Sequence, residues 1–423
     1  GDLDFSDANE DITQYVTSLV VQRGTDNTLN AGSLELMVYD PDGRFQPQHS
    51  GGPYGEGLTV GRRVEVTMSV PGGVEIPQFY GFIDGIAPEY VAEEEHVPLV
   101  SLTATDLLRP LEIRKITTGT LVGMTTGQIV DLLLNNLGWE PGIFTLNRSC
   151  LNMGDLLGGA DVSRRYVDTG RTVVPYCQWE NIPIATVIRD IVAAERGNFF
   201  VGKDGWVHYE DRHHRSSDRT SQGTLTDEHI SEMVVRYADE DLFNHVEVVA
   251  HPRSVGAAGS VVFDAIGDNN GHRLAPSETR EYHVSYTDRE TGRSCEATNI
   301  ITPVAPTDYA ANSKADGTGT DMTGSLGVTF EADENERYKF TLINNHSTQD
   351  IYVTKLQVRA TPLVTYDAVA MTATDELSIV QYLQRDMTLD SYLLSNPLEV
   401  QDYAAWLLYL YKNPRARVER LTL

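Results

Sequence analysis

The sequence is poor in cysteine, the residue that most often cross-links small proteins or holds zinc. Only three of its 423 residues are cysteines, Cys150, Cys177 and Cys295. They are odd in number, widely separated and without a CxxC spacing, so neither a disulfide framework nor a zinc site is indicated. We expect reduced, buried thiols.

Positive charge is scarce as well. The chain has 61 acidic against 33 basic residues, a net charge of −28, and only six of the basic residues are lysines. Sequence-independent binding of DNA or RNA needs a concentrated basic face that neutralises the phosphates. The composition excludes that class of function unless such a face is present, and the sequence shows none.

Long hydrophobic runs are also missing. No apolar stretch approaches the ~20 residues that cross a bilayer. The amino-terminal stretch GDLDFSDANED is acidic, unlike the basic and then apolar start of a signal peptide. We therefore expect a protein without a membrane span that is made in a cytoplasm.

The motifs of common enzymes are not found. The densest histidine group, His208, His213 and His214, lacks the HExxH and two-histidine-plus-carboxylate spacings, and no GxSxG elbow occurs. The acidic runs 93–95 and 331–337 are typical of solvated turns. A pair of catalytic carboxylates stays open, because their separation is a three-dimensional property. The sequence predicts no catalytic residue, no cofactor and no metal.

What the chain has in abundance is alternation of apolar and polar residues. Through the first hundred residues, segments of five to ten residues with period two are separated by Gly, Pro, Asp or Asn, which predicts an antiparallel β-barrel or sandwich. Between two of these strands lies a turn whose proline and glycine suit a chain reversal. We single out the residues of this turn: Asp40, Pro41, Asp42, Gly43, Arg44 and Phe45.

Two other interpretations of this turn fail. A calcium loop needs glycine at its sixth position, whereas Gly43 is fourth when Asp40 is counted as the first. A phosphate loop must lead into a helix, whereas another strand follows the glycines at 51–57.

Helices are expected only after residue 120. The first begins with a capping box between Thr125 and Gln128, and the second has Pro183 in its first turn and ends at Gly197. A hairpin at 198–210 with strands on either side of Asp204 and Gly205 follows the second helix. The core of this helix and hairpin is expected to contain Ile184, Val187, Ile188, Ile191, Phe199 and Trp206.

These patterns predict an α+β chain that is mainly β, with β-barrel domains, a small helix-plus-hairpin region and a β-sandwich-like insertion. The expected units are an amino-terminal β-barrel domain at 1–112, a helix-containing connecting region at 113–245, a second β domain with a variable insertion at 246–365, and a closing helix and strand at 366–423. The chain ends in a strand, RARVERLTL, with nothing after it, so we expect either a partner or a continuation to supply its neighbour.

The order of several stretches resembles the minor tail proteins of long-tailed phages. These stretches are DITQYVTSLVVQRG, GSLELMVYDPDGRF, FYGFIDGI, PIATVIRDIVAAERGNFFVGKDGWVHYEDR, LQVRATPLVTYD, DELSIVQYL and AAWLLYLYKNPRARVERLTL. The resemblance covers most of the chain except roughly 251–330 and is specific by order and combination.

The resemblance implies a tail-tip or baseplate hub of a phage or related tailed virus. Such a hub would be a homotrimer with two β-barrel-like domains per subunit, would sit at the tip of the virion tail and would be assembled in the host cytoplasm. Its partners would be a distal tail or tube protein, the tape measure and fibres or a spike. DNA would only pass through in transit, and the acidic charge of the chain suits a channel wall that repels phosphates.

Two other classes stay open. The insertion at 251–362 would be the working part of a receptor- or carbohydrate-binding module. A tail-associated cell-wall hydrolase would need a pocket with two carboxylates or a metal cluster.

Overall fold

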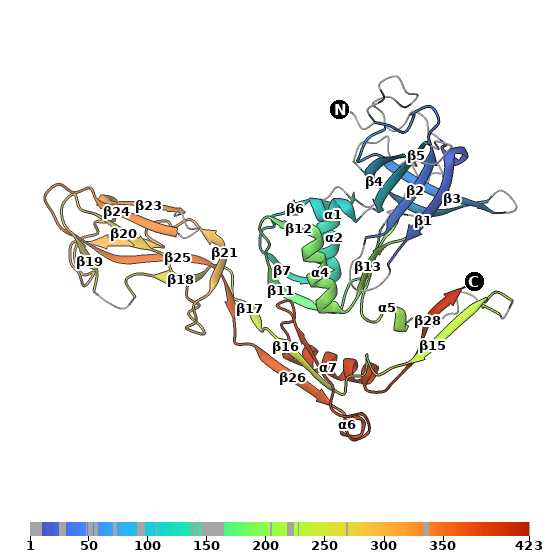
Figure 1. Cartoon of the computed structure of the whole chain (residues 1–423). Helices are drawn as coiled ribbons and strands as arrows, with labels where there is room; N and C mark the ends of the chain where they lie inside the picture. Colours follow the sequence, from blue (N-terminus) through green and yellow to red (C-terminus); the bar gives the residue numbers. More distant parts are fainter. Residues whose placement is uncertain are drawn as a thin grey trace.

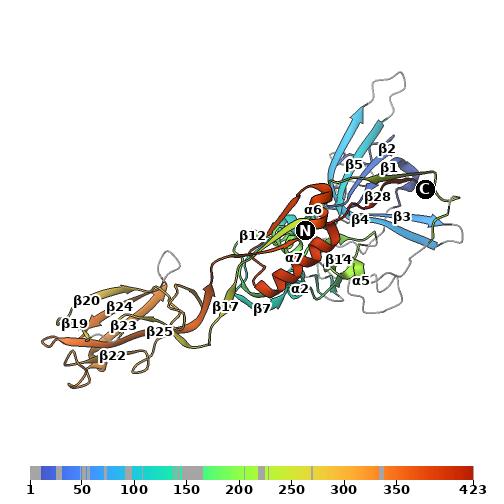
Figure 2. The ribbon, with the colours of Figure 1, turned by 90° about the horizontal axis from the view of Figure 1, so that it is seen from below.

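The computed structural model describes residues 11–24, 31–47, 49, 54, 58–70, 74–90, 98–106, 108–136, 139–140, 143–144, 165–203, 205–217, 224–226, 228–267, 270–332 and 338–422. Figures 1 and 2 show an elongated molecule in which a β-sandwich projects as an arm from one end of the body. The fold class expected from the sequence, α+β and mainly β, is confirmed.

The amino-terminal unit is one antiparallel five-stranded sheet. After the short 3-10 helix η1 (Thr13–Tyr15), its strands are β1 (Val16–Gln22), β2 (Ser33–Tyr39), β3 (Arg63–Val70), β4 (Val74–Tyr90) and β5 (Pro98–Asp106), in the order β1-β2-β5-β4-β3. Alternate residues of β2 and β5 are buried, as period two requires. Within the described residues β1 and β3 are not paired with each other, so the sheet is an open half-barrel and not a closed barrel.

The described part of the central unit packs helices among short strands. Its elements are α1 (Arg109–Ile113), β6 (Lys115–Ile116), β7 (Leu121–Thr125), α2 (Thr126–Asn136), β8 (Trp139–Glu140), β9 (Ile143–Phe144), β10 (Arg165–Val167), β11 (Val173–Cys177), β12 (Ile182–Pro183), α4 (Ile184–Glu195), β13 (Asn198–Val201), β14 (Val207–Glu210) and the short α5 (His214–Ser217). The capping box at the start of α2 is confirmed, since Gln128 N donates to Thr125 Oγ1 and Thr125 N donates to Gln128 Oε1.

Helix α4 ends differently from the expectation. The left-handed residue at its carboxyl end is Arg196, with φ +50°, and not Gly197. Gly197 is needed for another reason: a Cβ there would lie 2.3 Å from the Glu210 carbonyl oxygen of β14. The glycine therefore allows a close approach of two backbones, which a sequence pattern does not distinguish from a helix cap.

The closing unit is made of segments on both sides of the sandwich. Strand β16 (His245–Ala250) lies between β26 (Val369–Thr374) and β27 (Asp386–Asp390), and α6 (Glu376–Tyr382) connects the last two. Helix α7 (Pro397–Tyr411) covers this sheet through Val400, Tyr403 and Leu407, which share one continuous core with α2 and α4. Beyond it, β15 (Glu232–Tyr237) and β28 (Ala416–Thr422) pair with each other as a separate two-stranded ribbon that extends away from α7 (Figure 1).

The sandwich runs from Arg253 to Thr365 and has its own core around Phe340 and Val358. Its elements are β17 (Arg253–Val255), β18 (Ser260–Asp264), β19 (His272–Leu274), β20 (Thr279–His283), β21 (Glu296–Ile301), β22 (Tyr309–Asn312), η3 (Thr323–Ser325), β23 (Leu326–Ala332), β24 (Tyr338–Asn344) and the long β25 (Ile351–Thr365). One layer is built around β25 and the other is β20-β24-β23. The chain enters and leaves through the adjacent strands β17 and β25.

Candidate interaction surface

The ribbon of β15 and β28 exposes an apolar face. Met233 pairs with Leu421, Val235 with Val418 and Tyr237 with Ala416, and alternate residues of a strand point to the same side. The large side chains of this face keep a high fraction of their surface exposed: Met233 54%, Val235 47%, Tyr237 76%, Val418 56% and Leu421 41%. We call these residues, with Ala416, the ribbon face.

The opposite face of the ribbon is mostly charged. It carries the pairs Glu232–Thr422, Val234–Arg420 and Arg236–Arg417. Glu419 is the extra residue of a β-bulge between the pairs Val234–Arg420 and Val235–Val418. Because of this extra residue, the apolar side chains before and after the bulge stay on the same face of the ribbon. The ribbon is therefore amphipathic, although every residue in both of its strands is solvent-exposed.

A ribbon of this kind is expected to be only marginally stable when it is left exposed to water. Two strands without a third are marginally stable, and an exposed apolar face adds an unfavourable free energy on the order of 1 kcal/mol for each half-exposed side chain. Each strand also has one edge without a partner among the described residues. Both properties are typical of a surface that another chain covers.

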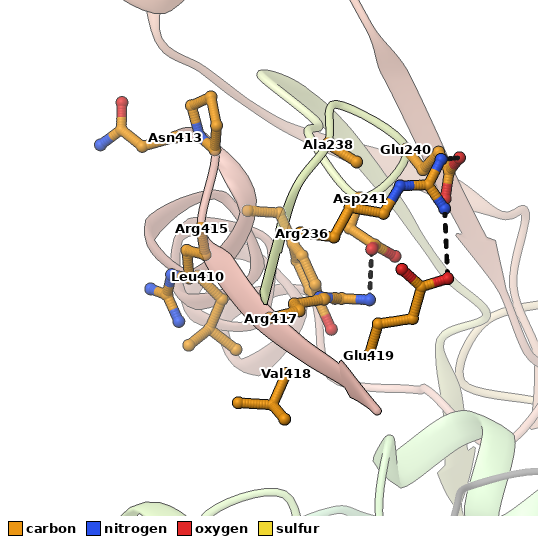
Figure 3. A pocket seen from close by; sticks show the side chains of 12 residues that line it. Arg236, Ala238, Glu240, Asp241, Leu410, Asn413, Arg415, Arg417, Val418 and Glu419 are labelled. Carbon is orange, nitrogen blue, oxygen red and sulfur yellow. Dashed lines mark hydrogen bonds and ion pairs between the residues drawn. The ribbon is translucent and has the colours of Figure 1, made fainter. Parts of the chain in front are cut away.

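A charged pocket lies at the base of the ribbon, with a cavity volume of about 410 Å³ (Figure 3). Arg236 lies 2.9 Å from Glu240 and 3.9 Å from Glu419, and Arg417 pairs with Asp241. These ion pairs are exposed, so each contributes little to stability. They join the ribbon to the neighbouring loop but leave the pocket open to solvent. Three arginines and three acids line the pocket and balance each other, which does not favour a particular ionic ligand.

A buried ion pair fixes the helix from which β28 emerges. Glu195, at the end of α4, has no exposed surface and accepts from Arg212 at 3.2 Å. Arg212 also donates to Glu399 of α7 at 3.1 Å, and its guanidinium carbon lies 4.1 Å from the centre of the Tyr403 ring. Burial and the nearby Glu195 carboxylate raise the pKa of the Tyr209 hydroxyl, so this tyrosine stays neutral.

The Glu195 carboxylate at the centre of this cluster is closed to solvent. Glu195 also accepts from Thr126 Oγ1 at 2.9 Å and from the Thr172 backbone at 3.1 Å, which occupies both of its oxygens together with Arg212 and the Arg171 backbone. A carboxylate so enclosed cannot contact a substrate. Its role is to join the central unit to α7 and, through α7, to hold the ribbon.

The histidine group of the sequence does not converge. His208 stacks on Phe200 with ring centres 4.9 Å apart, His213 contacts the edge of Trp406, and His214 Nδ1 lies 2.9 Å from Asp168. Within the described ranges no three His, Cys, Asp or Glu residues could hold a metal ion together. The acidic runs 93–95 and 333–337, Asp204 and Cys150 lie outside the described residues.

The turn that the sequence analysis singles out belongs to the amino-terminal sheet. Asp40 Oδ1 accepts from Phe45 N at 3.2 Å, and Gly43 has a φ of +70°. Phe45 is buried against Tyr15, while Asp42 pairs with Arg44. Pro41 lies at the exposed tip, and the contacts of the turn close one end of the sheet.

The expected helix-and-hairpin core is brought together in the central unit. Phe199 is buried, Trp206 is half-buried, and the α4 side chains are buried: Ile184, Val187, Ile188 and Ile191. The buried residues of this set belong to the core that α4 shares with α7, and none of the set belongs to the ribbon face. The sequence does not predict the ribbon face, although the apolar residues of EMVVRY are a local signal for it. The expectation that a partner or a continuation supplies the neighbour of the final strand is wrong for one edge, because β15 of the same chain pairs with β28.

No family model matches the chain, and no curated protein matches it. Among solved structures, the 43 kDa tail protein of prophage MuSo2 from Shewanella oneidensis is similar with a TM-score of 0.36 and 14% identity, covering 77% of this chain and 97% of that one. A tail protein from Neisseria meningitidis MC58 gives a TM-score of 0.34 and 11% identity, covering 77% and 95%. The prophage tail protein gp18 from Listeria monocytogenes EGD-e gives a TM-score of 0.31 and 10% identity, covering 59% of this chain and 61% of that one. All three are tail proteins, the class that the sequence resembles.

No helix in the described part of the chain is long and apolar enough to span a membrane.

Proposed function

We propose that the chain is a structural protein of a phage or related viral tail, a tail-tip or baseplate hub that assembles as a homotrimer. In this role it connects the tail tube to distal tail proteins, to fibres or to a spike, and it surrounds part of the path of the DNA. Its working parts are surfaces and not reactive groups, so the proposal includes no enzymatic activity. The single observation that carries it is the exposed ribbon face.

The ribbon face suits self-association for a physical reason. An apolar surface on a rigid, anchored ribbon gains free energy when a matching surface covers it, and identical copies supply matching surfaces in a closed ring. The free edges of β15 and β28 offer backbone donors and acceptors to the same neighbour. Of the four units expected from the sequence, divided near residues 112, 245 and 365, the first, second and fourth would then form the body of each subunit, and the third would carry the projecting sandwich.

The acidic composition supports a passage for DNA. A wall that carries basic residues would bind phosphates by releasing their counterions, whereas an acidic wall lets the DNA slide. With a net charge of −28 per chain, we expect an excess of Asp and Glu on the bore of the assembly. A bore lined with lysine or arginine would contradict this part of the proposal.

Two neighbouring valines give a matched test of self-association. Val235 is on the ribbon face and Val234, which pairs with Arg420, is on the opposite face. We expect the wild-type protein to form a threefold assembly in native mass measurement. Val235→Glu should shift the protein to the monomer, because the new carboxylate would be buried in the interface without a countercharge. Val234→Glu should leave the trimer intact.

The same measurement separates other outcomes. A wild-type monomer at micromolar concentration, or loss of the assembly in both variants, would contradict the proposal. A ring of six would instead favour a tube-adaptor protein. Circular dichroism of each variant establishes that the fold is retained.

The sandwich favours a second candidate function, binding of a receptor or a carbohydrate. It projects from the body as a separate arm with its own core (Figures 1 and 2). Tyr366 N donates to the Pro252 carbonyl at 2.9 Å, so residues 253–365 can be replaced by a short glycine linker without moving the ends. If this variant assembles into virions normally but loses host adsorption, the arm is the binding module. If adsorption is unchanged, the arm has no such role.

A further inference from the structure

Helix α6 presents a second exposed apolar surface, separate from the ribbon. Leu377 and Val380 are each 83% exposed and Leu383, just after the helix, is 76% exposed. Leu377 and Val380 are three residues apart, which places them on one side of the helix, and Leu383 follows Val380 at the carboxyl end of the helix. The opposite side is fixed to the body through the buried Ser378. We call Leu377, Val380 and Leu383 the α6 knob.

The α6 knob stands on a rigid support. Asn244 is completely buried and donates from Nδ2 to the Leu383 carbonyl at 2.8 Å and to Ser378 Oγ at 3.2 Å, while its Oδ1 accepts from Arg385 N. Ser378 Oγ in turn donates to the Lys412 carbonyl at 2.6 Å. A surface held by this many buried hydrogen bonds loses little conformational entropy when a partner binds.

Leu383 also has an unfavourable backbone conformation. Its φ of +67° and ψ of 161° lie in a region that only glycine adopts easily, and it costs other residues on the order of 1–3 kcal/mol. Asn244 holds this conformation through the Leu383 carbonyl and the Arg385 backbone N–H, which both lie on the carboxyl side of Leu383 Cα. A strained, exposed leucine on a fixed support is typical of a residue retained for contact with another molecule and not for the stability of the free chain.

The charges around the α6 knob indicate which kind of molecule would bind to it. Glu376, next to Leu377, has no ionic or hydrogen-bond partner among the described residues, whereas the nearby cations are neutralised: Lys412 pairs with Asp375 and Arg385 with Asp239. The rim of the knob is therefore acidic on a chain of net charge −28. A second α6 knob would bring like charge to this rim, whereas lysine or arginine at the edge of a partner's contact surface would neutralise Glu376.

From these observations we infer that the α6 knob is a docking site for a different protein, whose contact surface is apolar at its centre and rimmed with lysine or arginine. The apolar centre covers Leu377, Val380 and Leu383, and the basic rim pairs with Glu376. This interface is additional to the self-association proposed above and does not depend on it, because the knob and the ribbon face share no residue.

A photo-crosslinking experiment on the full-length protein tests the inference. Val380 is replaced by p-benzoylphenylalanine, and the matched control carries the same substitution at Leu398, which is 74% exposed at the start of α7. The probe is a biotin-labelled amphipathic peptide of about five helical turns with a leucine stripe and lysines on its flanks. A second peptide has glutamates in place of the lysines.

We expect the adduct with the lysine peptide to form at position 380 at least about tenfold more strongly than at position 398, equivalent to about 1.4 kcal/mol. Glu376→Gln should weaken it, as should high salt, because both remove the charge attraction. Equal labelling at the two positions would overturn the inference, and so would equal labelling by the two peptides. An adduct between two protein chains at position 380 would also overturn it, because the occupant would then be a second copy.

Discussion

Arg253 stacks on Tyr176 where the sandwich joins the body. Its guanidinium carbon lies 5.4 Å from the centre of the tyrosine ring, and its Nη1 donates a hydrogen bond of 3.0 Å to the Tyr176 carbonyl. The ring of Tyr392 lies on another side of the same guanidinium, at 5.5 Å. Because Arg253 is the first residue of the sandwich and both tyrosines belong to the body, this contact helps to orient the arm, together with the hydrogen bond of 2.7 Å between the Tyr176 and Thr365 hydroxyls.

We therefore expect Arg253→Ala to loosen the arm. The variant loses cation–π contacts worth on the order of 1–2 kcal/mol and one hydrogen bond. Small-angle scattering should show a broader distribution of distances within the molecule. Arg273→Ala, which removes an exposed ion pair with Asp350 within the sandwich, is the control and should leave the distribution unchanged. Identical curves for the wild type and Arg253→Ala would show that other contacts fix the arm.

Removing one partner of the buried pair between Glu195 of α4 and Arg212, which follows β14, should strongly destabilise the protein. Glu195→Gln leaves the buried Arg212 with only the partly exposed Glu399 as an ionic partner, and breaking a buried pair costs up to about 3–5 kcal/mol. The free energy of unfolding in urea measures the change. Glu240→Gln removes the partner of Arg236 at an exposed pair and should cost less than about 1 kcal/mol. Equal losses in the two variants would contradict the importance of burial.

Leu383→Gly should stabilise the free chain. Glycine relieves the backbone strain at φ +67°. Its greater conformational freedom in the unfolded chain offsets only part of this stabilisation, so we expect the free energy of unfolding to rise by about 1 kcal/mol. Leu398→Gly, in a helix of ordinary conformation, should lose about 1 kcal/mol. Chemical unfolding compares the two. If both variants lose stability equally, Leu383 is not strained in the folded state.

Asp106 should give the stability a dependence on pH. Burial raises the pKa of its carboxyl group to about 6 from 3.8, against the opposing hydrogen bonds from the Leu108 and Gly32 backbone. A group whose pKa is raised on folding stabilises the protein fully below its unfolded pKa, and this contribution disappears as the pH rises through the folded value. The loss from about pH 4 to pH 6 is on the order of 3 kcal/mol.

The comparison with Asp106→Asn isolates this contribution, because asparagine does not titrate. The difference in free energy of unfolding between the two proteins should change between about pH 4 and pH 6 and be constant above and below that range. Parallel curves across the range would mean that the two backbone hydrogen bonds outweigh the burial.

Much of the fold follows from local patterns. Period-two alternation predicts the strands of the amino-terminal sheet, and the stripe of α4 predicts the buried side chains Val187 and Ile191. The capping box at Thr125 needs only residues three apart. The role of Gly197 was misassigned because the residue that it approaches, Glu210, belongs to another strand, and the sequence does not show how closely two backbones pass.

The sequence by itself determined the class of the fold, the turn at Asp40–Phe45 and the scarcity of reactive groups, because these depend on composition and on neighbours along the chain. Only the tertiary structure decided that Val235 and Val418 form part of one exposed face, since a strand's inner and outer sides are defined by what packs against it. The same holds for the α6 knob, whose exposure depends on how Asn244 holds the helix from below.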